Sequence, residues 1–504
     1  MKRTIYCLFW KVQVLTAMTC LLTLAPVDGA QLMAQPLSLA EHFVVREVAA
    51  GKTADLAHMQ HKEISGRFLE TFLADPKKYL KTMPRSVRIK SAVISGPVDL
   101  TNADIAYEMV LAHCTFMDNL ILTDGRFRQG LKLGDSTFRD ITIERATVDG
   151  TLDIQGATFE GKASFLYAKL QGSLEGKKAQ FQNPDAVVSL NGAKISENMV
   201  LEEATFRGAV DFTGATISGD LMANGVAFLN EEKLVTFNDL TLTGSAFLNA
   251  GVFAGPVDFR NMQITRSFEL EEAKFLSKRD PKRFTNPLPG NPMHAPIVYN
   301  VDFRRTQVGG TLWLVKANFH SRIRLEGLTY QDINMGPLEE FAWKRLFEKS
   351  VYSVDIYSRL EEYLRKQGYT EEANEVFIEG KSRQRQERLH GLTWLWSWML
   401  ALLVGYGRHP EYAAYWSVIP LVAGYLTFRN EKGMHLVDPD APPSRYSPFW
   451  YSIDMFLPLT RLQAAEVWIP KRERRWAWLY MRVHVILGWI LVPIGLAALM
   501  GIIK

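Results

Sequence analysis

The chain has 504 residues, of which 47% are apolar and 12 are Trp, and its 58 Lys and Arg against 54 Asp and Glu give a net charge of +4 at pH 7. This small charge argues against nucleic-acid binding, and no basic stripe interleaved with aromatic residues runs along the chain. The three Cys residues exclude a disulfide framework and a Cys-based metal site, and the His residues are scattered, so we expect no metal or other cofactor. The apolar content predicts a contact with lipid, and the length allows two or three domains.

Residues 1–34 predict a signal peptide or an N-terminal anchor. Met1-Lys2-Arg3 precedes an apolar stretch from Val12 to Val27, and polar residues follow Ala30. A basic start, an apolar run and a small residue at its end are typical of export signals. Either form places the region that follows across a membrane.

Residues 35–90 predict two helices. Leu39 and Phe43 recur at helical spacing in the first segment, and Ile64, Phe68 and Phe72 do so in the second. We expect these helices to cap the first coil of the next region, because an uncovered strand edge would pair with other chains.

Residues 91–336 repeat one short phrase in which a small residue is followed two positions later by a bulky apolar residue. Four copies are Ala157-Thr158-Phe159-Glu160-Gly161, Ala168-Lys169-Leu170-Gln171-Gly172, Ala204-Thr205-Phe206-Arg207-Gly208 and Ala215-Thr216-Ile217-Ser218-Gly219. The phrase advances by eleven residues, and two such steps close one coil. The alternation of apolar and polar residues predicts strands, and the fixed period predicts a solenoid.

A single coil cannot bury its bulky residues alone, so we expect the coils to stack into a parallel β-helix of either hand around one shared interior. In the stretch 204–221 the residues expected to stack on the next coil are Phe206, Val210, Phe212, Ile217 and Leu221. The glycines after the bulky positions are expected to supply the corner conformations. These glycines are Gly161, Gly172, Gly208, Gly214 and Gly219.

This region resembles the pentapeptide-repeat family, whose square coils place an apolar residue at each face centre and a small residue two places before it. Asn102-Ala103-Asp104-Ile105 comes closest to the five-residue unit, which appears here as alternating fives and sixes. The resemblance covers about half of the chain. It implies a parallel β-helix solenoid for this region. With the segments on either side, the expected fold is mainly β: a parallel β-helix solenoid with an N-terminal helical cap, a helical neck and C-terminal transmembrane helices.

Residues 337–390 change to a helical period and predict a helical hairpin, the neck. Tyr357, Leu360 and Leu364 recur on its first helix, Lys366-Gln367-Gly368-Tyr369 form the turn, and a second helix follows. We expect the hairpin to cap the last coil, and a groove for a partner is the alternative.

Residues 391–504 predict a membrane domain. The apolar segments 392–404 and 412–428 are joined by a turn rich in Gly and Pro and predict a membrane hairpin, and 476–503 is long enough to cross alone. The segment 448–459 is apolar but short, which predicts a re-entrant or interfacial position.

The block from Tyr451-Ser452-Ile453-Asp454 to Trp468-Ile469-Pro470, together with Gly488-Trp489, extends the resemblance to almost the whole chain. The chain is similar to a bacterial family of pentapeptide-repeat membrane proteins, whose members are sometimes labelled membrane-associated oxidoreductases. That label implies a redox cofactor, but the sequence has no Gly-rich dinucleotide fingerprint, no Cys pair able to cycle electrons and no paired His. We therefore expect a protein that is not an enzyme.

Asp454 is an acidic residue in a predicted membrane segment, where a carboxylate is costly without a partner. We expect Asp454 to pair with Arg482 or His484 and so to hold the short segment against the last helix, and a proton relay is the alternative use. Beside that helix lies a basic cluster, Lys471, Arg472, Arg474 and Arg475. This cluster is expected to contact anionic lipid on the cytoplasmic side.

Two signals for membrane orientation conflict. Basic residues before the first apolar segment favour a cytoplasmic repeat domain by the positive-inside rule, whereas the export signal favours the opposite side. We favour export, because a long translocated domain can override local charge. The expectation is a multi-pass protein of the bacterial inner membrane whose repeat domain is periplasmic rather than cytoplasmic.

The leading functional hypothesis is a membrane-anchored β-helix scaffold of the bacterial cell envelope with a protein partner along the solenoid face. The alternative is an oligomeric ion channel or transporter-like protein with a degenerate pore segment at 448–460, lined by Ser452, Asp454 and Thr460. A filter needs Gly-rich backbone, and Leu457-Pro458-Leu459-Thr460 has no Gly. The strand acids Glu202, Asp211 and Asp220 are expected to lie on solvated faces rather than in a catalytic groove.

Overall fold

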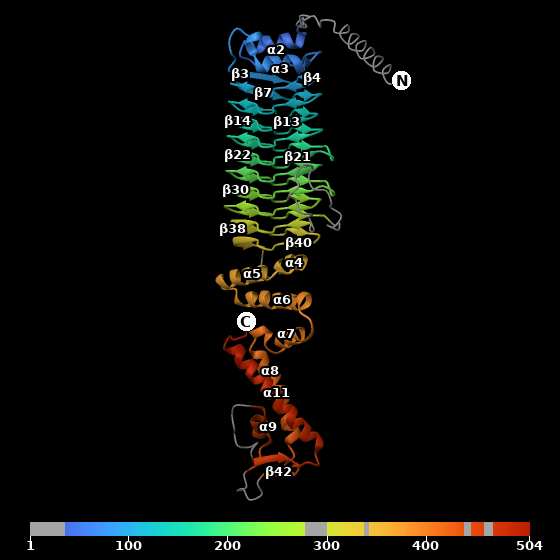
Figure 1. The fold of residues 1–504 in the computed structure, drawn as a ribbon, viewed down its shortest axis with the longest axis vertical. Coiled ribbons are helices and arrows are strands. Elements are labelled where there is room, and N and C mark those ends of the chain that lie inside the picture. Colours follow the sequence, from blue (N-terminus) through green and yellow to red (C-terminus); the bar gives the residue numbers. More distant parts are fainter. Residues whose placement is uncertain (1–35, 278–299, 337–341, 438–444, 458–466, 504) are drawn as a thin grey trace, which may run out of the picture.

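The computed structural model describes residues 36–277, 300–336, 342–437, 445–457 and 467–503. The predicted signal peptide or anchor at residues 1–34 lies outside them. The molecule is a long rod in which a helical cap, a β-solenoid, the neck and a helical bundle follow one another along one axis (Figure 1).

The cap contains the two predicted helices, α2 (Leu39–Ala49) and α3 (Gly66–Ala74). Glu41 is the third helical residue of α2, and its buried carboxylate accepts hydrogen bonds from the Ser38 N–H at 2.8 Å and from the Ser65 N–H and hydroxyl at 3.0 Å. Two short cap strands, β1 (Ala54–Asp55) and β2 (Glu63–Ser65), pair in parallel with β3 (Ser86–Lys90) and β4 (Val93–Ser95). The cap therefore covers the first solenoid turn with backbone hydrogen bonds as well as with helices.

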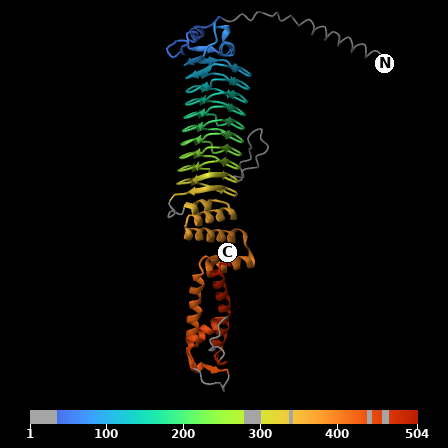
Figure 2. The same ribbon diagram turned by 90° about the vertical axis from the view of Figure 1, so that its left-hand side faces the viewer.

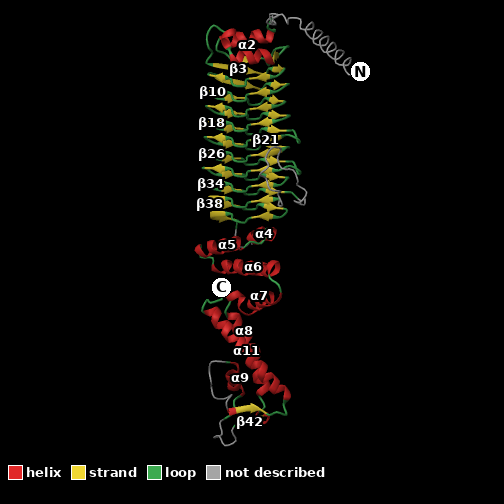
Figure 3. Cartoon of the chain, viewed as in Figure 1, coloured by secondary structure: helices red, strands yellow, loops and turns green. Residues whose placement is uncertain are grey.

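The solenoid spans residues 86–334 and makes about ten turns of parallel β-structure. Each turn has four short strands, as in β13 (Ile141–Thr142), β14 (Thr147–Val148), β15 (Leu152–Asp153) and β16 (Thr158–Phe159), after which β17 (Ala163–Ser164) pairs with β13 one turn on. The strands stack in columns along the rod up to β40 (Ile323–Arg324) and β41 (Thr329–Asn334) (Figure 3). The predicted parallel β-helix is confirmed, but the chain as a whole is mixed α/β rather than mainly β, because helices form the cap, the neck and the bundle.

Strand register confirms that two eleven-residue steps close one turn. Thr158 lies opposite Gln180, and Phe206 lies opposite Phe228. One column of nine Phe residues stacks face to face, with neighbouring ring centroids 4.5–5.4 Å apart. They are Phe116, Phe138, Phe159, Phe181, Phe206, Phe228, Phe253, Phe275 and Phe319.

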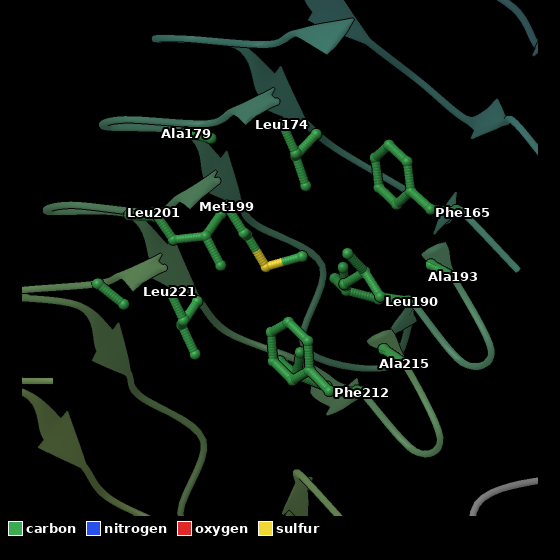
Figure 4. Packing of buried hydrophobic residues seen from close by; sticks show 14 of the residues in the cluster. Phe165, Leu174, Ala179, Leu190, Ala193, Met199, Leu201, Phe212, Ala215 and Leu221 are labelled. Atoms are coloured by element: carbon green, nitrogen blue, oxygen red, sulfur yellow. The ribbon is translucent and has the colours of Figure 1, made fainter. Parts of the chain in front are cut away.

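Across the interior, side chains from opposite columns meet in one dry core. Leu174, Met199 and Leu221 project from one wall toward Phe165 and Phe212 on the other (Figure 4). The same apolar core continues into the cap at one end and into the neck at the other.

The turn corners correct one expectation. Of the five glycines predicted to supply the corner conformations, only Gly214 has a positive φ, +64°. Other residues occupy the left-handed corners with φ between 53° and 60°, among them Asn102, His113, Asp124, Asp135, Arg145, Tyr167, Lys178 and Glu203. At the other four predicted positions glycine is needed for space, as at Gly161, where a Cβ would lie 2.2 Å from Asp140 Oδ1 and 2.3 Å from the Arg139 carbonyl oxygen of the adjacent turn.

Longer connections occur at one corner in three of the turns, whereas the earlier turns have short connections there. At this corner most turns have a short connection, like the one between β24 (Thr205–Phe206) and β25 (Ala209–Asp211). Longer links join β20 (Gln180–Phe181) to β21 (Val187–Ser189), β28 (Ala227–Phe228) to β29 (Val235–Thr236), and β36 (Lys274–Phe275) to β37 (Val301–Asp302). The first two contact each other, because the Asn230 side-chain amide donates to the Pro184 carbonyl at 3.2 Å.

The neck consists of α4 (Ala342–Lys349), α5 (Val354–Lys366) and α6 (Thr370–Arg388). The predicted hairpin and its turn are confirmed, and Gly368 in the turn has a φ of +87°. Helix α4 is an addition to the prediction, and its Trp343 and Phe347 belong to the solenoid core. The neck therefore continues the apolar interior of the solenoid past its last turn.

The bundle beyond the neck contains α7 (Gly391–Val404), α8 (Glu411–Phe428), α9 (Pro448–Phe456) and α11 (Arg475–Leu499), with a two-stranded sheet of β42 (Met434–Leu436) and β43 (Trp468–Pro470) at its far end. Helices α8 and α11 run along the rod, whereas α7 lies across it (Figures 1 and 2). Segments 392–404 and 412–428 therefore do not form the predicted membrane hairpin. At ~1.5 Å per residue the 14 residues of α7 span only about 21 Å, less than the ~30 Å hydrocarbon core of a bilayer.

Within the described residues, α11 is the one helix both long and apolar enough to cross a membrane. The several spans of the expected multi-pass arrangement are therefore not shown, and the described residues contain one helix that meets these criteria. Only 28% of the most apolar stretch of α11 is buried, whereas the core helix of a soluble protein is mostly buried.

Candidate functional site: the bundle and its junction with the neck

Helices α8 and α11 pack antiparallel through small residues. Ala413 at the start of α8 faces Gly495 near the end of α11, where a Cβ on the glycine would lie 3.0 Å from the Ala413 Cβ. Gly424 near the end of α8 lies beside His484 in the first half of α11. Small residues allow close helix approach where water does not drive association, as in membrane bundles.

Helix α9 is held against the same pair at a still closer approach. A Cβ on Gly488 of α11 would lie 1.8 Å from the Phe456 carbonyl oxygen at the end of α9. Any side chain at position 488 would therefore displace the short helix.

The centre of the bundle is polar and is organised by His484, which is fully buried. Its Nε2 lies 2.8 Å from the Ser452 carbonyl oxygen of α9, and the hydroxyl of Tyr480 lies 3.3 Å from its Nδ1. The Tyr480 hydroxyl donates to the Pro420 carbonyl at 2.8 Å, and the Ser452 hydroxyl donates to the Leu421 carbonyl at 3.0 Å. These bonds join α8, α9 and α11 at one level.

The structure places the three residues of the predicted polar pair at different contacts. His484 does connect the last helix to the short segment, but through the Ser452 carbonyl, two residues before Asp454. The Arg482 guanidinium lies over the Trp478 ring at 4.0 Å from its centroid. Asp454 is buried on α9, and among the described residues no ion pair or hydrogen bond joins it to Arg482 or His484.

The sequence did not identify Tyr480 or Gly488 as residues that pack near His484 at the centre of the bundle. Both stand on the same face of α11 as His484, at spacings of four residues. That spacing was a readable signal, since small or polar residues recurring on one face of an apolar helix mark the packed side.

The outer surface of the bundle is apolar on all sides. Leu392 of α7 is 84% exposed, Trp476 of α11 is 83% exposed, and many large apolar side chains on these helices and on α8 are uncovered. Others are Trp394, Trp396, Trp398, Tyr415, Ile419, Leu426, Ile486, Trp489 and Leu499. A patch of this size marks a surface that contacts lipid or another protein.

The basic cluster Lys471, Arg472, Arg474 and Arg475 is exposed and lies at the end of the bundle farthest from the solenoid (Figure 1). It stands at the N-terminus of α11, where the helix dipole disfavours cations, and no acidic residue lies in the first turn. The cluster therefore has a local electrostatic cost that an external anion would relieve.

The neck meets the bundle in a charged junction that the sequence did not reveal. Arg408, in the turn between α7 and α8, donates to Glu361 of α5 at 2.6 Å and lies over the Phe377 ring of α6 at 4.2 Å. Arg385 of α6 donates to the Tyr406 hydroxyl at 2.8 Å. Both side chains from the turn after α7 are thus held by the neck.

The solenoid acids considered as catalytic candidates make structural contacts. Glu202 pairs with Lys177 at 2.8 Å, Asp211 accepts from Asn191 at 3.1 Å, and Asp220 accepts from the Ser245 N–H at 2.7 Å. Across the described ranges, no group of three His, Cys, Asp or Glu residues could hold a metal ion.

Comparison with family models, with curated proteins and with solved structures finds no match for this chain.

Proposed function

We propose that this chain is a non-enzymatic scaffold of the bacterial inner membrane, in which the bundle anchors the solenoid and the solenoid presents a long, regular surface to a protein partner. The observation that carries the proposal is the apolar surface of the bundle, which exposes Trp, Leu and Ile while His484 and Ser452 are buried at its centre. This arrangement suits a hydrocarbon solvent and would aggregate in water.

The depth of the bundle in the bilayer follows from its helix directions. We propose that α11 crosses the membrane, that the antiparallel α8 carries the chain through the lipid beside it to the other side, and that α7 lies flat in the interface, where its three Trp residues suit the headgroup level. At ~1.5 Å per residue the 25 residues of α11 span about 37 Å, which is long enough to cross with some tilt.

The charges at the far end of the bundle support the proposed orientation, against the basic residues before α7 that favour the opposite one. The cluster Lys471, Arg472, Arg474 and Arg475 lies at the far end of the bundle, and Arg429 and Lys432 after α8 lie there too. The positive-inside rule favours the cytoplasm for this end, where the cluster would contact anionic lipid. The solenoid is then periplasmic, in agreement with the export signal expected from residues 1–34.

The partner face proposed for the solenoid is the corner with the longer connections 182–186 and 229–234. Where insertions occur at a single corner, they mark the side of a repeat array on which the sequence is free to vary for binding. We further infer a relationship to pentapeptide-repeat proteins, supported by the four strands of each turn.

The channel alternative has no favouring observation. Ser452 is fully buried inside one bundle and hydrogen-bonded to α8, so it does not face outward to line a shared pore, and Thr460 lies outside the described residues.

Two measurements test the proposal. In bacterial membranes the full chain should resist carbonate extraction, whereas a chain ending at Arg388 should be released. Alkaline phosphatase fused after Gly336 should be active, and a fluorescent protein fused after Arg475 should fluoresce, because the two points would lie on opposite sides. Release of the full chain by carbonate would refute the anchor, and two fusions reporting the same side would refute the orientation.

A further inference from the structure

A cavity of about 400 Å³ opens between the end of α6, the start of α7 and the C-terminus of the chain. Its walls differ in character. Lys381, Gln384 and Tyr406 contribute a polar wall, and Trp396, Leu400 and Ile503 contribute an apolar wall. We infer that this cavity binds one anionic phospholipid, with the phosphate on the polar wall and an acyl chain on the apolar wall. The inference rests on the proposed membrane anchor.

The polar wall carries positive charge without an acidic residue in the lining. The Lys381 ammonium lies over the Phe377 ring at 5.1 Å from its centroid. Behind the wall, Arg385 donates to the Tyr406 hydroxyl, which is also 3.0 Å from the Ser397 hydroxyl. Lys381 thus supplies the cation of the lining, Arg385 lies behind Tyr406, and charge-assisted bonds from such cations to phosphate are among the strong ones.

The start of α7 adds a second anion-binding element. Its N-cap residue, His390, makes no side-chain capping bond, and Leu392 and Thr393 of its first turn line the cavity. The first N–H groups of a helix lack intrahelical partners and carry the positive end of the helix dipole. Here they open beside the two cations.

The level of the cavity suits a lipid better than a soluble anion. It lies where the charged neck meets the apolar bundle, beside the helix that runs across the rod (Figures 1 and 2). Its apolar wall continues into the exposed apolar surface of α7 and the end of α11, so an acyl chain can enter sideways from the bilayer. A soluble phosphate would use only the polar wall and would leave Trp396 and Leu400 in water.

The test uses the full chain, purified in detergent and analysed by native mass spectrometry with phosphatidylglycerol, phosphatidylcholine or glycerol phosphate added. We expect one phosphatidylglycerol per chain, bound at least about tenfold more tightly than phosphatidylcholine. Lys381→Glu should remove that preference, and Lys381→Gln/Arg385→Gln should weaken phosphatidylglycerol binding by about tenfold or more. The matched control, Lys169→Gln/Lys194→Gln at exposed positions of the solenoid strands, should keep the bound lipid.

Three results would overturn the inference: equal binding of the two lipids by the unaltered chain, an unchanged preference in Lys381→Glu, or glycerol phosphate displacing the lipid at equal concentration. Lys381→Glu leaves the Arg385–Tyr406 contact in place, so its result does not depend on the integrity of the junction. Carbonate extraction distinguishes failure of the lipid site from failure of the membrane anchor. A variant that loses lipid preference but stays in the membrane confirms the site and the anchor independently, whereas release of the unaltered chain rejects the anchor.

Discussion

The solenoid and the bundle differ in the residues that they expose. In the solenoid, stacked Phe, Leu and Ile fill the interior, and Thr, Lys and Glu face outward. In the bundle, His484 and Ser452 are buried together with apolar residues such as Phe428 and Tyr451, while Trp, Leu and Ile cover the outside. Large apolar side chains are therefore buried at one end of the rod and exposed at the other, because the two ends are built for different solvents.

The largest effect should come from breaking the stacked column of the solenoid. Phe206 is buried between Phe181 and Phe228, at centroid distances of 4.6 Å and 5.0 Å. Phe206→Ala should cost about 3–5 kcal/mol, because the rigid turns above and below cannot collapse into the space. Hydrogen exchange of the solenoid amides in the full chain measures this loss. Trp398→Ala, an exposed aromatic of the bundle, is the control and should leave solenoid exchange unchanged.

The next largest effect tests directly whether lipid or water surrounds the bundle. Ile486 is 58% exposed near the middle of α11. If α11 crosses the membrane, Ile486→Asp should cost about 3 kcal/mol of insertion, since a carboxylate at the centre of a spanning helix is unfavourable by that order. The share of chain resisting carbonate extraction measures it. Gln180→Asp, on an exposed solenoid strand, should change that share little, and equal behaviour of the two variants would contradict the comparison.

The solenoid was predictable because its information is local and repeated. Each step from Ala to Phe identifies a side chain that points inward, and the eleven-residue period identifies the residue on which that side chain stacks in the next turn. The corners were mistaken because glycine serves two purposes, left-handed φ and close approach, and the second depends on the neighbouring turn, as Gly161 against Asp140 shows. Some residues that adopt left-handed φ are of the types that favour it, such as Asn102 and Asp124, but others, such as Tyr167 and Glu203, carry no compositional signal.

The bundle was predictable only in part. Apolar segments give helices α7, α8, α9 and α11 within a few residues. They do not give direction, so α7 was expected to cross although it lies across the rod. The sequence also pointed to His484 as a contact of the short segment, but not to the Ser452 carbonyl as its partner. That contact depends on how closely Gly488 lets Phe456 approach, which no periodic pattern encodes.

A smaller effect should distinguish two close helix contacts within the bundle. Gly488→Ala places a Cβ against the Phe456 carbonyl, and we expect about 2 kcal/mol of destabilisation from the forced shift of α9. Gly495→Ala meets only the Ala413 methyl at 3.0 Å and should cost less. Unfolding of the detergent-solubilised chain by added sodium dodecyl sulfate compares the two. Equal losses would mean that α9 is not held at the position described.

The smallest effect tests how dry the solenoid interior is. Cys114 is buried beside the first turns, and burial raises the pKa of its thiol to about 12 from a usual value of 9.0. The folded state then holds this proton more tightly than the unfolded state, so the contribution is constant below pH 9 and stability falls as the pH rises from 9 toward 12. At pH 10 the loss should be about 1.4 kcal/mol relative to pH 7. Denaturant unfolding followed by circular dichroism measures it, with Cys114→Ala as the reference that lacks the group. Because other groups titrate alike in both chains, the difference between their pH slopes isolates the thiol, and identical slopes would mean that water reaches this part of the core.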